Sequence, residues 1–303
     1  MKVAAFDCGT NALRLLIADI DAHGRLTEIR RELRTVRLGE GVDATGQFSE
    51  AALARTFAVC DEYAQLVAQH DVSRQVFVAT SASRDVSNRE SFVTGVHARL
   101  GVVPQVIDGA AEARYSFIGA TTSLPRLQPL AMVVDIGGGS TEFVTEDAAV
   151  SVNVGCVRMT ERHLHNDPPT PQEQEAVAAD ITAAFASVPA SIDLARISTV
   201  VGVAGTVTTI AARALGLERY DPKRLHGAVV CSEAMQRAGT ELLAMTRSQR
   251  SALTYMHPGR VDVIGGGAMV LSAVIELTGA AFITVSECDI LDGIAAAAAT
   301  ATP

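Results

Sequence analysis

VAAFDCGTNALRLLIAD (residues 3–19) contains a series of features that predicts the fold. The same series occurs a second time in MVVDIGGGSTEFVTED (residues 132–147). Each has an apolar strand, an aspartate, a glycine-containing turn with Thr or Ser, and a second apolar strand. The repetition predicts two related α/β halves. Three consecutive glycines, as in the second stretch, are costly in conformational entropy unless the backbone must approach something closely.

Strand and helix patterns alternate after the first of these stretches. Residues 26–38 predict a third strand of a meander, residues 49–71 an amphipathic helix with Ser49 as its N-cap, and residues 75–80 a buried strand. The alternation continues to a helix over residues 110–124. This order is typical of an α/β fold.

The chain is expected to form two domains. Residues 124–130 contain two prolines and predict a linker, after which the pattern of strands restarts. We expect a first domain of residues 1–118 with the C-terminal helix 291–303, because that helix is expected to cross back, and a second domain of residues 119–290.

Composition indicates a compact globular protein. The 303 residues are 48% hydrophobic and 19% charged, with a net charge of −9 that argues against broad nucleic-acid binding. Five scattered cysteines without a C-x-x-C pair favour reduced thiols and a cytoplasmic location. Residues 264–285 are interrupted by glycines and Glu276, so a helix followed by a strand is expected there rather than a membrane span.

Three turns have the composition of phosphate-binding loops. They lie at residues 7–11 (DCGTN), 135–142 (DIGGGSTE) and 203–209 (VAGTVTT), each directly after an apolar strand. Glycines let successive backbone N–H groups converge on an anion, and hydroxyl groups add donors. The alternative is that each is only a tight turn. The fingerprints of P-loop and Rossmann nucleotide sites are absent from the sequence.

Acidic residues beside such turns indicate a divalent cation. Asp7, Asp135 and Glu142 would repel a polyphosphate unless Mg²⁺ lay between them, and Mg²⁺ accepts one or two carboxylates together with phosphate oxygens. The alternative is that these acids cap turns. Glu112 stands near the start of a predicted helix, where spacing alone indicates only a favourable interaction with the helix dipole.

Eight motifs together resemble the exopolyphosphatase/guanosine pentaphosphate phosphohydrolase (Ppx/GppA) family over nearly the whole chain. They are FDCGTN, VRLGEGV, VATSASRDVSN, DGAAEAR, VVDIGGGSTEF, VNVGCVRMTER, AGTVTT and GRVDVI. The resemblance implies two ribonuclease-H-like domains of the actin and sugar-kinase superfamily around a central cleft. It also implies an enzyme that uses Mg²⁺ to remove the terminal phosphate of inorganic polyphosphate or of guanosine pentaphosphate. K⁺ as a stimulating cation and a homodimer are further expectations from the resemblance.

The resemblance also implies roles for individual residues. Glu112 aligns with the glutamate that activates the attacking water, Asp135 and Glu142 with acids that position metal and water, and Arg84 with an arginine suited to phosphate oxygens. Gly9, Thr10, Asn11, Gly138, Gly139 and Ser140 align with the phosphate-binding turns, to which the composition of these turns adds Gly137, Thr141, Gly205 and Thr206. Arg158 and His226 are candidate contacts for a longer substrate.

Two departures from the family pattern and two rival functions stand beside this interpretation. Ala111 replaces a glutamate that often precedes the catalytic one, and DILDG (residues 289–293) replaces a Gly-Leu-Arg-Glu-Gly run, which leaves the substrate preference open. A kinase of the same superfamily would need an adenosine pocket and no water-activating base. A sensor of polyphosphate or guanosine tetraphosphate would bind its ligand without hydrolysis.

Overall fold

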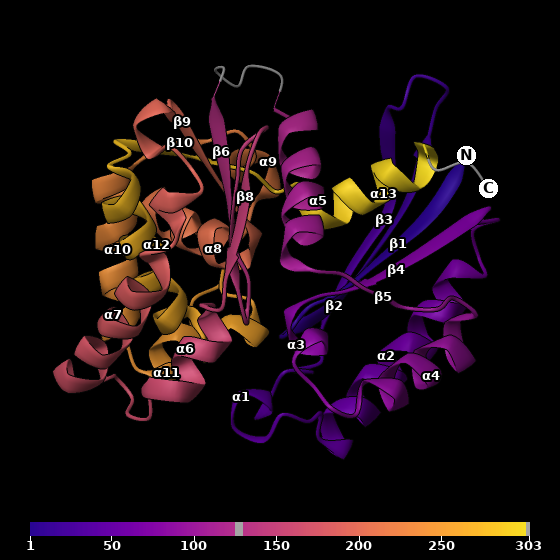
Figure 1. Ribbon diagram of the computed structural model, residues 1–303, viewed down its shortest axis with the longest axis horizontal. Helices are drawn as coiled ribbons and strands as arrows, with labels where there is room; N and C mark the ends of the chain where they lie inside the picture. Colours follow the sequence, from indigo (N-terminus) through magenta and orange to yellow (C-terminus); the bar gives the residue numbers. More distant parts are fainter. Residues whose placement is uncertain (125–129, 301–303) are drawn as a thin grey trace. The chain divides into compact units, whose positions relative to one another are not determined.

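The computed structural model describes residues 1–124 and 130–300, which form two compact units (Figure 1). The first unit comprises Met1–Gly119 and Ile290–Pro303, and the second comprises Ala120–Asp289. The predicted linker lies outside the described residues except for its two ends. None of the helices in the described ranges is long and apolar enough to cross a membrane.

The first unit is built on a five-stranded sheet with the order β3-β2-β1-β4-β5. The three strands of the predicted meander pair antiparallel, and β4 and β5 continue the sheet parallel to β1. This arrangement places the carboxyl ends of β1 and β4 at the same edge. The strands are β1 Lys2–Cys8, β2 Ala12–Ile20, β3 Leu26–Thr35, β4 Arg74–Ala79 and β5 Gln105–Val106.

Helices cover both faces of the first sheet. On one face, α2 and α4 pack against Phe6 and Phe77 in the core, and the Ser49 hydroxyl accepts the amide of Ala52, which confirms the predicted N-cap of α2. On the other face, Leu291 and neighbouring residues of α13 pack against β1, β2 and β4. The helices are α1 Val42–Thr45, α2 Glu50–Val67, α3 Ser81–Arg84, α4 Arg89–Leu100, α5 Gly109–Thr122, which runs on into the second unit, and α13 Ile290–Thr300.

The second unit is built on a six-stranded sheet with the order β10-β11-β9-β6-β7-β8. β6, β7 and β8 form an antiparallel meander, β9 and β11 run parallel to β6, and β10 closes the edge antiparallel to β11. The strands are β6 Ala131–Ile136, β7 Thr141–Val144, β8 Ala149–Val152, β9 Thr199–Val203, β10 Val229–Cys231 and β11 Phe282–Val285.

Helices of the second unit enclose one large core that includes Phe143 and Phe185. α7 begins with a capping box between Thr170 and Glu173, and α12 ends at Gly279 in the left-handed region. The helices are α6 Cys156–His163, α7 Pro171–Phe185, α8 Ala204–Ala214, α9 Pro222–Leu225, α10 Ser232–Ala244, α11 Arg247–Ser251 and α12 Ile264–Thr278, with short 3₁₀ turns at Val188–Ala190, Leu194–Arg196 and Pro258–Arg260.

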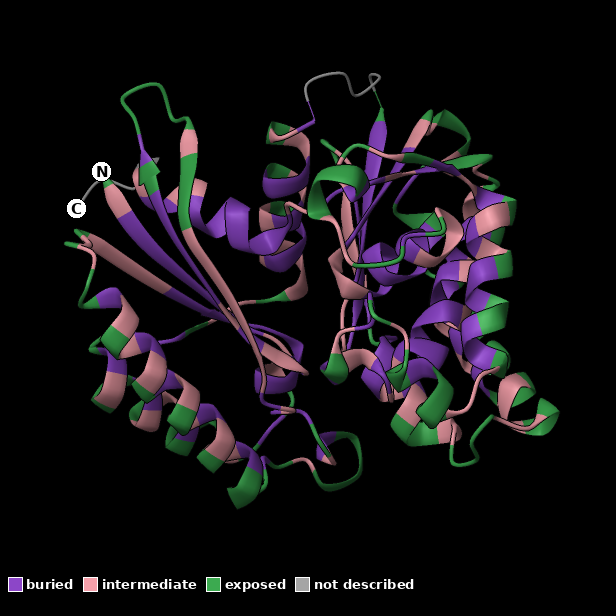
Figure 2. Ribbon diagram, turned by 180° about the vertical axis from the view of Figure 1, so that it is seen from behind, coloured by how far each residue is buried: buried purple, intermediate pink, exposed green. Residues whose placement is uncertain are grey.

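The two sheets share one topology. In each, a three-stranded antiparallel meander is followed by two strands that run parallel to its first strand, which is the ribonuclease-H-like arrangement. β1, β2 and β3 of the first unit thus correspond to β6, β7 and β8 of the second, and β4 corresponds to β9. Figure 2 shows buried residues along the strands and exposed residues along the outer sides of the helices. The predicted fold class is therefore confirmed.

Candidate active site

Two buried carboxylates face each other across the β6–β7 hairpin of the second unit. Asp135 is the register partner of Glu142, so both side chains point to the same side of the sheet. Only 6% of Asp135 and 1% of Glu142 is exposed, and the Ser151 hydroxyl donates to Glu142 Oε1 at 2.7 Å. Side chains directly opposite each other have Cβ atoms about 4.5–5.5 Å apart, so one cation could contact both carboxylates.

The glycine turn between these carboxylates is held by the start of α6. The amide of Cys156 donates to the carbonyl of Gly137 at 3.0 Å, and the amide of Arg158 donates to the carbonyl of Gly138 at 3.1 Å. The Nε atom of Arg158 donates to the carbonyl of Gly139 at 2.8 Å. Packing alone therefore favours glycine at position 155, since a Cβ on Gly155 would lie 2.5 Å from the carbonyl carbon of Gly138.

The turn between β9 and α8 leaves the sheet at the same edge as the glycine turn. Val203 at the end of β9 is the parallel register partner of Asp135. The next residue, Ala204, has a φ of 67°, a left-handed conformation that residues with a Cβ rarely adopt. Thr206 follows, buried, in the first turn of α8, where backbone N–H groups favour anions.

Arg260 places a positive charge at this turn. Its Nη1 atom donates to Thr209 Oγ1 at 3.0 Å, and its guanidinium lies 5.8 Å from the ring centroid of Tyr220. A Cβ on Gly205 would overlap that guanidinium, so the glycine admits the arginine to the start of α8. The guanidinium of Arg260 therefore lies at the turn after β9, which leaves the sheet at the same edge as the turn after β6.

The acid pair has the donor chemistry of a magnesium site that substrate completes. No group of three or more His, Cys, Asp or Glu side chains suited to a metal ion occurs in residues 1–124 and 130–300. Mg²⁺ is typically held by one or two carboxylates together with waters and phosphate oxygens. Two carboxylates on adjacent strands, such as Asp135 and Glu142, therefore have donor chemistry that fits Mg²⁺ bound together with a phosphate.

The corresponding hairpin of the first unit carries an ion pair. Asp7 in β1 is the register partner of Arg14 in β2. Arg14 donates to Asp7 Oδ2 from Nε at 2.8 Å and from Nη2 at 2.6 Å. The side chain of Asp7 is 5% exposed and that of Arg14 is 20% exposed. Asp7, predicted as a metal ligand, thus has a guanidinium as an internal counterion.

The turn between β1 and β2 is closely packed. The hydroxyls of Thr10 and Ser81 are 2.9 Å apart, which links this turn to the start of α3. The amide of Gly9 donates to the carbonyl of Ala12 at 3.0 Å, and the carbonyl of Asn11 accepts the amide of Val36 at 3.0 Å. The structure therefore brings Gly9, Thr10 and Asn11 to the carboxyl ends of β1 and β4.

Glu112 and Arg84, predicted to have separate roles, form an ion pair. Arg84 Nη1 donates to Glu112 Oε2 at 2.7 Å and to the carbonyl of Ile107 at 3.2 Å. Glu112 is 8% exposed in the first turn of α5, and Arg84 ends α3 directly beyond β4. The arginine therefore fixes the direction of the carboxylate.

Two other predicted residues make contacts within the frame of the second unit. Both ring nitrogens of His226 face backbone groups, with Nε2 at 3.3 Å from the carbonyl of Ser123 and Nδ1 at 3.3 Å from the amide of Glu287. The Thr141 hydroxyl is fully buried and donates to the carbonyl of Val154 at 2.6 Å. A substrate would have to displace these bonds to reach either side chain.

The two cysteines nearest the strand-end turns are protonated thiols at neutral pH. Burial raises the pKa of Cys8 well above its ordinary value, and the neighbouring Cys60 and Asp7 add to the shift. Burial also raises the pKa of Cys156, although a hydrogen bond with Thr206 and the charge of Arg260 oppose the shift. Since the thiolate is the nucleophilic form, neither cysteine is suited to covalent catalysis.

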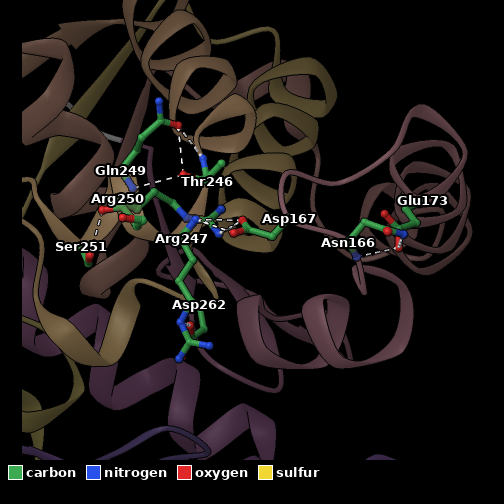
Figure 3. A network of polar contacts seen from close by, with 10 residues as sticks. Asn166, Asp167, Glu173, Thr246, Arg247, Gln249, Arg250, Ser251 and Asp262 are labelled. Carbon is green, nitrogen blue, oxygen red and sulfur yellow. Dashed lines mark hydrogen bonds and ion pairs between the residues drawn. The ribbon is translucent and has the colours of Figure 1, made fainter.

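A polar network holds the loop that follows α6 (Figure 3). The carboxylate of Asp167 accepts the amide of Arg247 at 2.8 and 2.9 Å and Arg250 Nη2 at 3.1 Å. Arg247 in turn forms an ion pair with Asp262 at 2.7 Å. Burial lowers the pKa of Arg250, because its guanidinium has little access to water. The network thus ties the α6–α7 loop to α11.

Sequence reasoning missed several residues of these turns. Arg14 was detectable, because a hairpin that pairs Cys8 with Leu13 also pairs Asp7 with Arg14. Ser151 was detectable in the same way as the register partner of Glu142. Arg260 lies in the GRVDVI motif, but its approach to α8 from a 3₁₀ turn distant in the sequence had no local signal.

The fold and these residues define a ribonuclease-H-like protein of two units with acidic and glycine-rich turns at its strand ends. The sequence matches the model of the Ppx/GppA phosphatase family over residues 16–298. The chain belongs to the Ppx/GppA phosphatase family.

Individual relatives are similar over almost the whole chain. Exopolyphosphatase 2 of Mycobacterium tuberculosis is 46% identical over 314 residues, which cover 97% of each sequence. The crystal structure of an exopolyphosphatase-like protein is 41% identical with a TM-score of 0.94 and covers 98% of this chain and 97% of that chain. An exopolyphosphatase from Cytophaga hutchinsonii is 26% identical with a TM-score of 0.89 and covers 97% and 96%.

Proposed function

We propose that the protein is a Mg²⁺-dependent exopolyphosphatase that releases orthophosphate from the end of inorganic polyphosphate. The observation that carries the proposal is the pair of buried carboxylates, Asp135 and Glu142, on adjacent strands beside a glycine turn. Membership of the family and the similarity to Exopolyphosphatase 2 support it further.

The second unit supplies the groups that bind the terminal phosphate. Asp135 and Glu142 would hold Mg²⁺, which when bound neutralises phosphate charge and polarises the phosphorus. The glycine turn, residues 137–140, and the first turn of α8 with Thr206 offer backbone N–H groups and hydroxyls to phosphate oxygens. Arg260 adds a fixed positive charge at the same edge.

The first unit supplies the proposed base. Glu112 is oriented by Arg84 and accepts a proton from the attacking water. The water oxygen forms a bond to the terminal phosphorus, the bond from that phosphorus to the bridging oxygen breaks, and the shortened polyphosphate leaves with the electron pair. The products are orthophosphate and a chain with one phosphate fewer. No covalent intermediate is needed, in agreement with the protonated cysteines.

The test is release of inorganic phosphate from short and long polyphosphate, guanosine pentaphosphate and ATP, each with Mg²⁺ and with a chelator. We expect release from polyphosphate that requires Mg²⁺ and that falls by about 10³-fold in Glu112→Gln, which keeps the size of the side chain but removes the base. Arg99→Gln, at a partly exposed ion pair with Asp61 in the first unit, is the control.

The other outcomes separate the rival functions. Preferred hydrolysis of guanosine pentaphosphate would overturn the polyphosphate assignment while retaining the reaction type. Binding of polyphosphate without phosphate release would favour a sensor, and transfer of the ATP phosphate to an acceptor would favour a kinase. The homodimer that the resemblance suggests is tested by light scattering of the native protein.

A further inference from the structure

The DILDG run, which departs from the family pattern, carries an ion pair within the first unit. Asp292 accepts Arg31 Nη2 on Oδ1 at 2.5 Å and Arg31 Nη1 on Oδ2 at 3.3 Å. Such a two-pronged contact between guanidinium and carboxylate fixes orientation as well as distance. The side chain of Asp292 is 11% exposed and that of Arg31 is 30% exposed, so water screens the pair only partly.

The ion pair joins α13 to the face of the sheet that carries Asp7 and Arg14. Arg31 is the register partner of Leu16, and Leu16 belongs with Leu291 and Ile294 to the small core beneath α13. Side chains alternate between faces along a strand, so Arg14 and Leu16 of β2 lie on the same face. Asp292 is therefore anchored where α13 crosses the meander.

The next residue brings α13 against the helix that carries Glu112. A Cβ on Gly293 would overlap the carbonyl oxygen of Tyr115, so the two helix backbones touch at this point. Tyr115 lies three residues after Glu112 in α5. Ile107, whose carbonyl accepts Arg84, packs against the same small core beneath α13.

We propose that Arg31, Asp292 and Gly293 form a latch that positions the first turn of α5 and thereby Glu112. The latch acts through packing: the ion pair fixes the register of α13, and Gly293 sets its distance from Tyr115. Arg31 and Asp292 are positioning residues, because they act on the base through α13 and α5. The inference rests on the proposed function only for the role of Glu112.

The test compares Asp292→Asn and Arg31→Gln with the native protein at a temperature at which all are folded. We expect kcat for polyphosphate to fall about tenfold with KM within about twofold, because a misplaced base weakens the chemical step and leaves phosphate binding intact. Arg34→Gln, on the same strand and paired with Glu62, is the control and is expected to keep native kcat.

Amide hydrogen exchange provides a readout that does not depend on activity. Faster exchange in the first turn of α5 in Asp292→Asn, with Arg34→Gln unchanged, is expected. Unchanged kcat and unchanged exchange in both single variants would overturn the latch, even if their melting temperatures fell. If the native protein hydrolyses none of the substrates, the proposed function fails, and the exchange experiment still decides whether the latch exists.

Discussion

The first hairpins of the two units share a topology but differ in charge. In the first unit Asp7 faces Arg14, whereas in the second Asp135 faces Glu142 at the corresponding positions of β6 and β7. The first pair is neutral by itself. The second pair places two buried carboxylates directly opposite each other.

The same strand arrangement therefore carries two different charge patterns in the two units. We propose that a hairpin whose acid is paired with arginine holds its turn in place without a ligand, whereas the hairpin with two acids would be stabilised by a bound cation. Glu112, held by Arg84, is likewise satisfied within the first unit. We infer that the first unit orients the base and that the second unit holds the metal and phosphate.

The largest expected effect comes from removing a charge of the acid pair. Asp135→Asn and Glu142→Gln should each lower Mg²⁺-dependent phosphate release by about 10²–10³-fold, since each removes a proposed metal ligand. Without Mg²⁺ the free energy of unfolding of the same variants should rise by about 0.5–1 kcal/mol, because each substitution removes a repulsion between like charges directly opposite each other. Activity within a factor of about two of native would show that the acid pair does not have the proposed metal role.

Removing the ion pair of the first unit should lower the free energy of unfolding and leave the Mg²⁺ dependence unchanged. Asp7→Asn leaves Arg14 without its buried counterion and should lower the free energy of unfolding by about 2–3 kcal/mol, measured by urea denaturation. The Mg²⁺ concentration for half-maximal activity should not change. Asp19→Asn, at an exposed ion pair of β2, should cost less than about 1 kcal/mol. A loss of Mg²⁺ affinity in Asp7→Asn would assign a metal role to both hairpins.

The packing of the turns offers a smaller contrast. A methyl group at Gly155 would meet the backbone of Gly138, whereas one at Gly39 would mainly meet the side-chain methyl group of Thr10. Gly155→Ala should therefore cost about 1–3 kcal/mol and reduce activity, and Gly39→Ala should cost less. Thermal unfolding and phosphate release of both variants test this order, and equal losses would contradict it.

The smallest effect is expected at Cys156. Because burial raises its pKa, the thiol stays protonated at neutral pH and Cys156→Ala should keep activity within about threefold of native. Alkylation by iodoacetamide at pH 8 should be slower in the native protein than in urea. A loss of activity comparable to that of Glu112→Gln would instead point to a nucleophilic cysteine.

Much of the fold was predictable because hairpins and helices are encoded locally. The alternation of apolar residues indicated both meanders, and the Ser49 cap indicated the start of α2. Residues 156–163 were not predicted as α6, because the start of that short helix depends on the carbonyls of the glycine turn. β10 was missed because its three residues are a strand only through pairing with β11.

The candidate site was predictable in its parts but not in its pairings. The proximity of Asp135 and Glu142 followed from their separation around a turn. The ion pair of Arg84 with Glu112 spans 28 residues and two elements, so no local pattern reports it. The partner of Asp292, 261 residues away at Arg31, is equally invisible to spacing.

The most direct measurement is phosphate release from long-chain polyphosphate as a function of Mg²⁺ concentration for the native protein, Asp135→Asn and Asp7→Asn. We expect that the native protein requires Mg²⁺, that Asp135→Asn loses both activity and the Mg²⁺ response, and that Asp7→Asn, assayed while folded, keeps the native Mg²⁺ dependence. Equal phosphate release by the native protein with a chelator and with Mg²⁺ would contradict it.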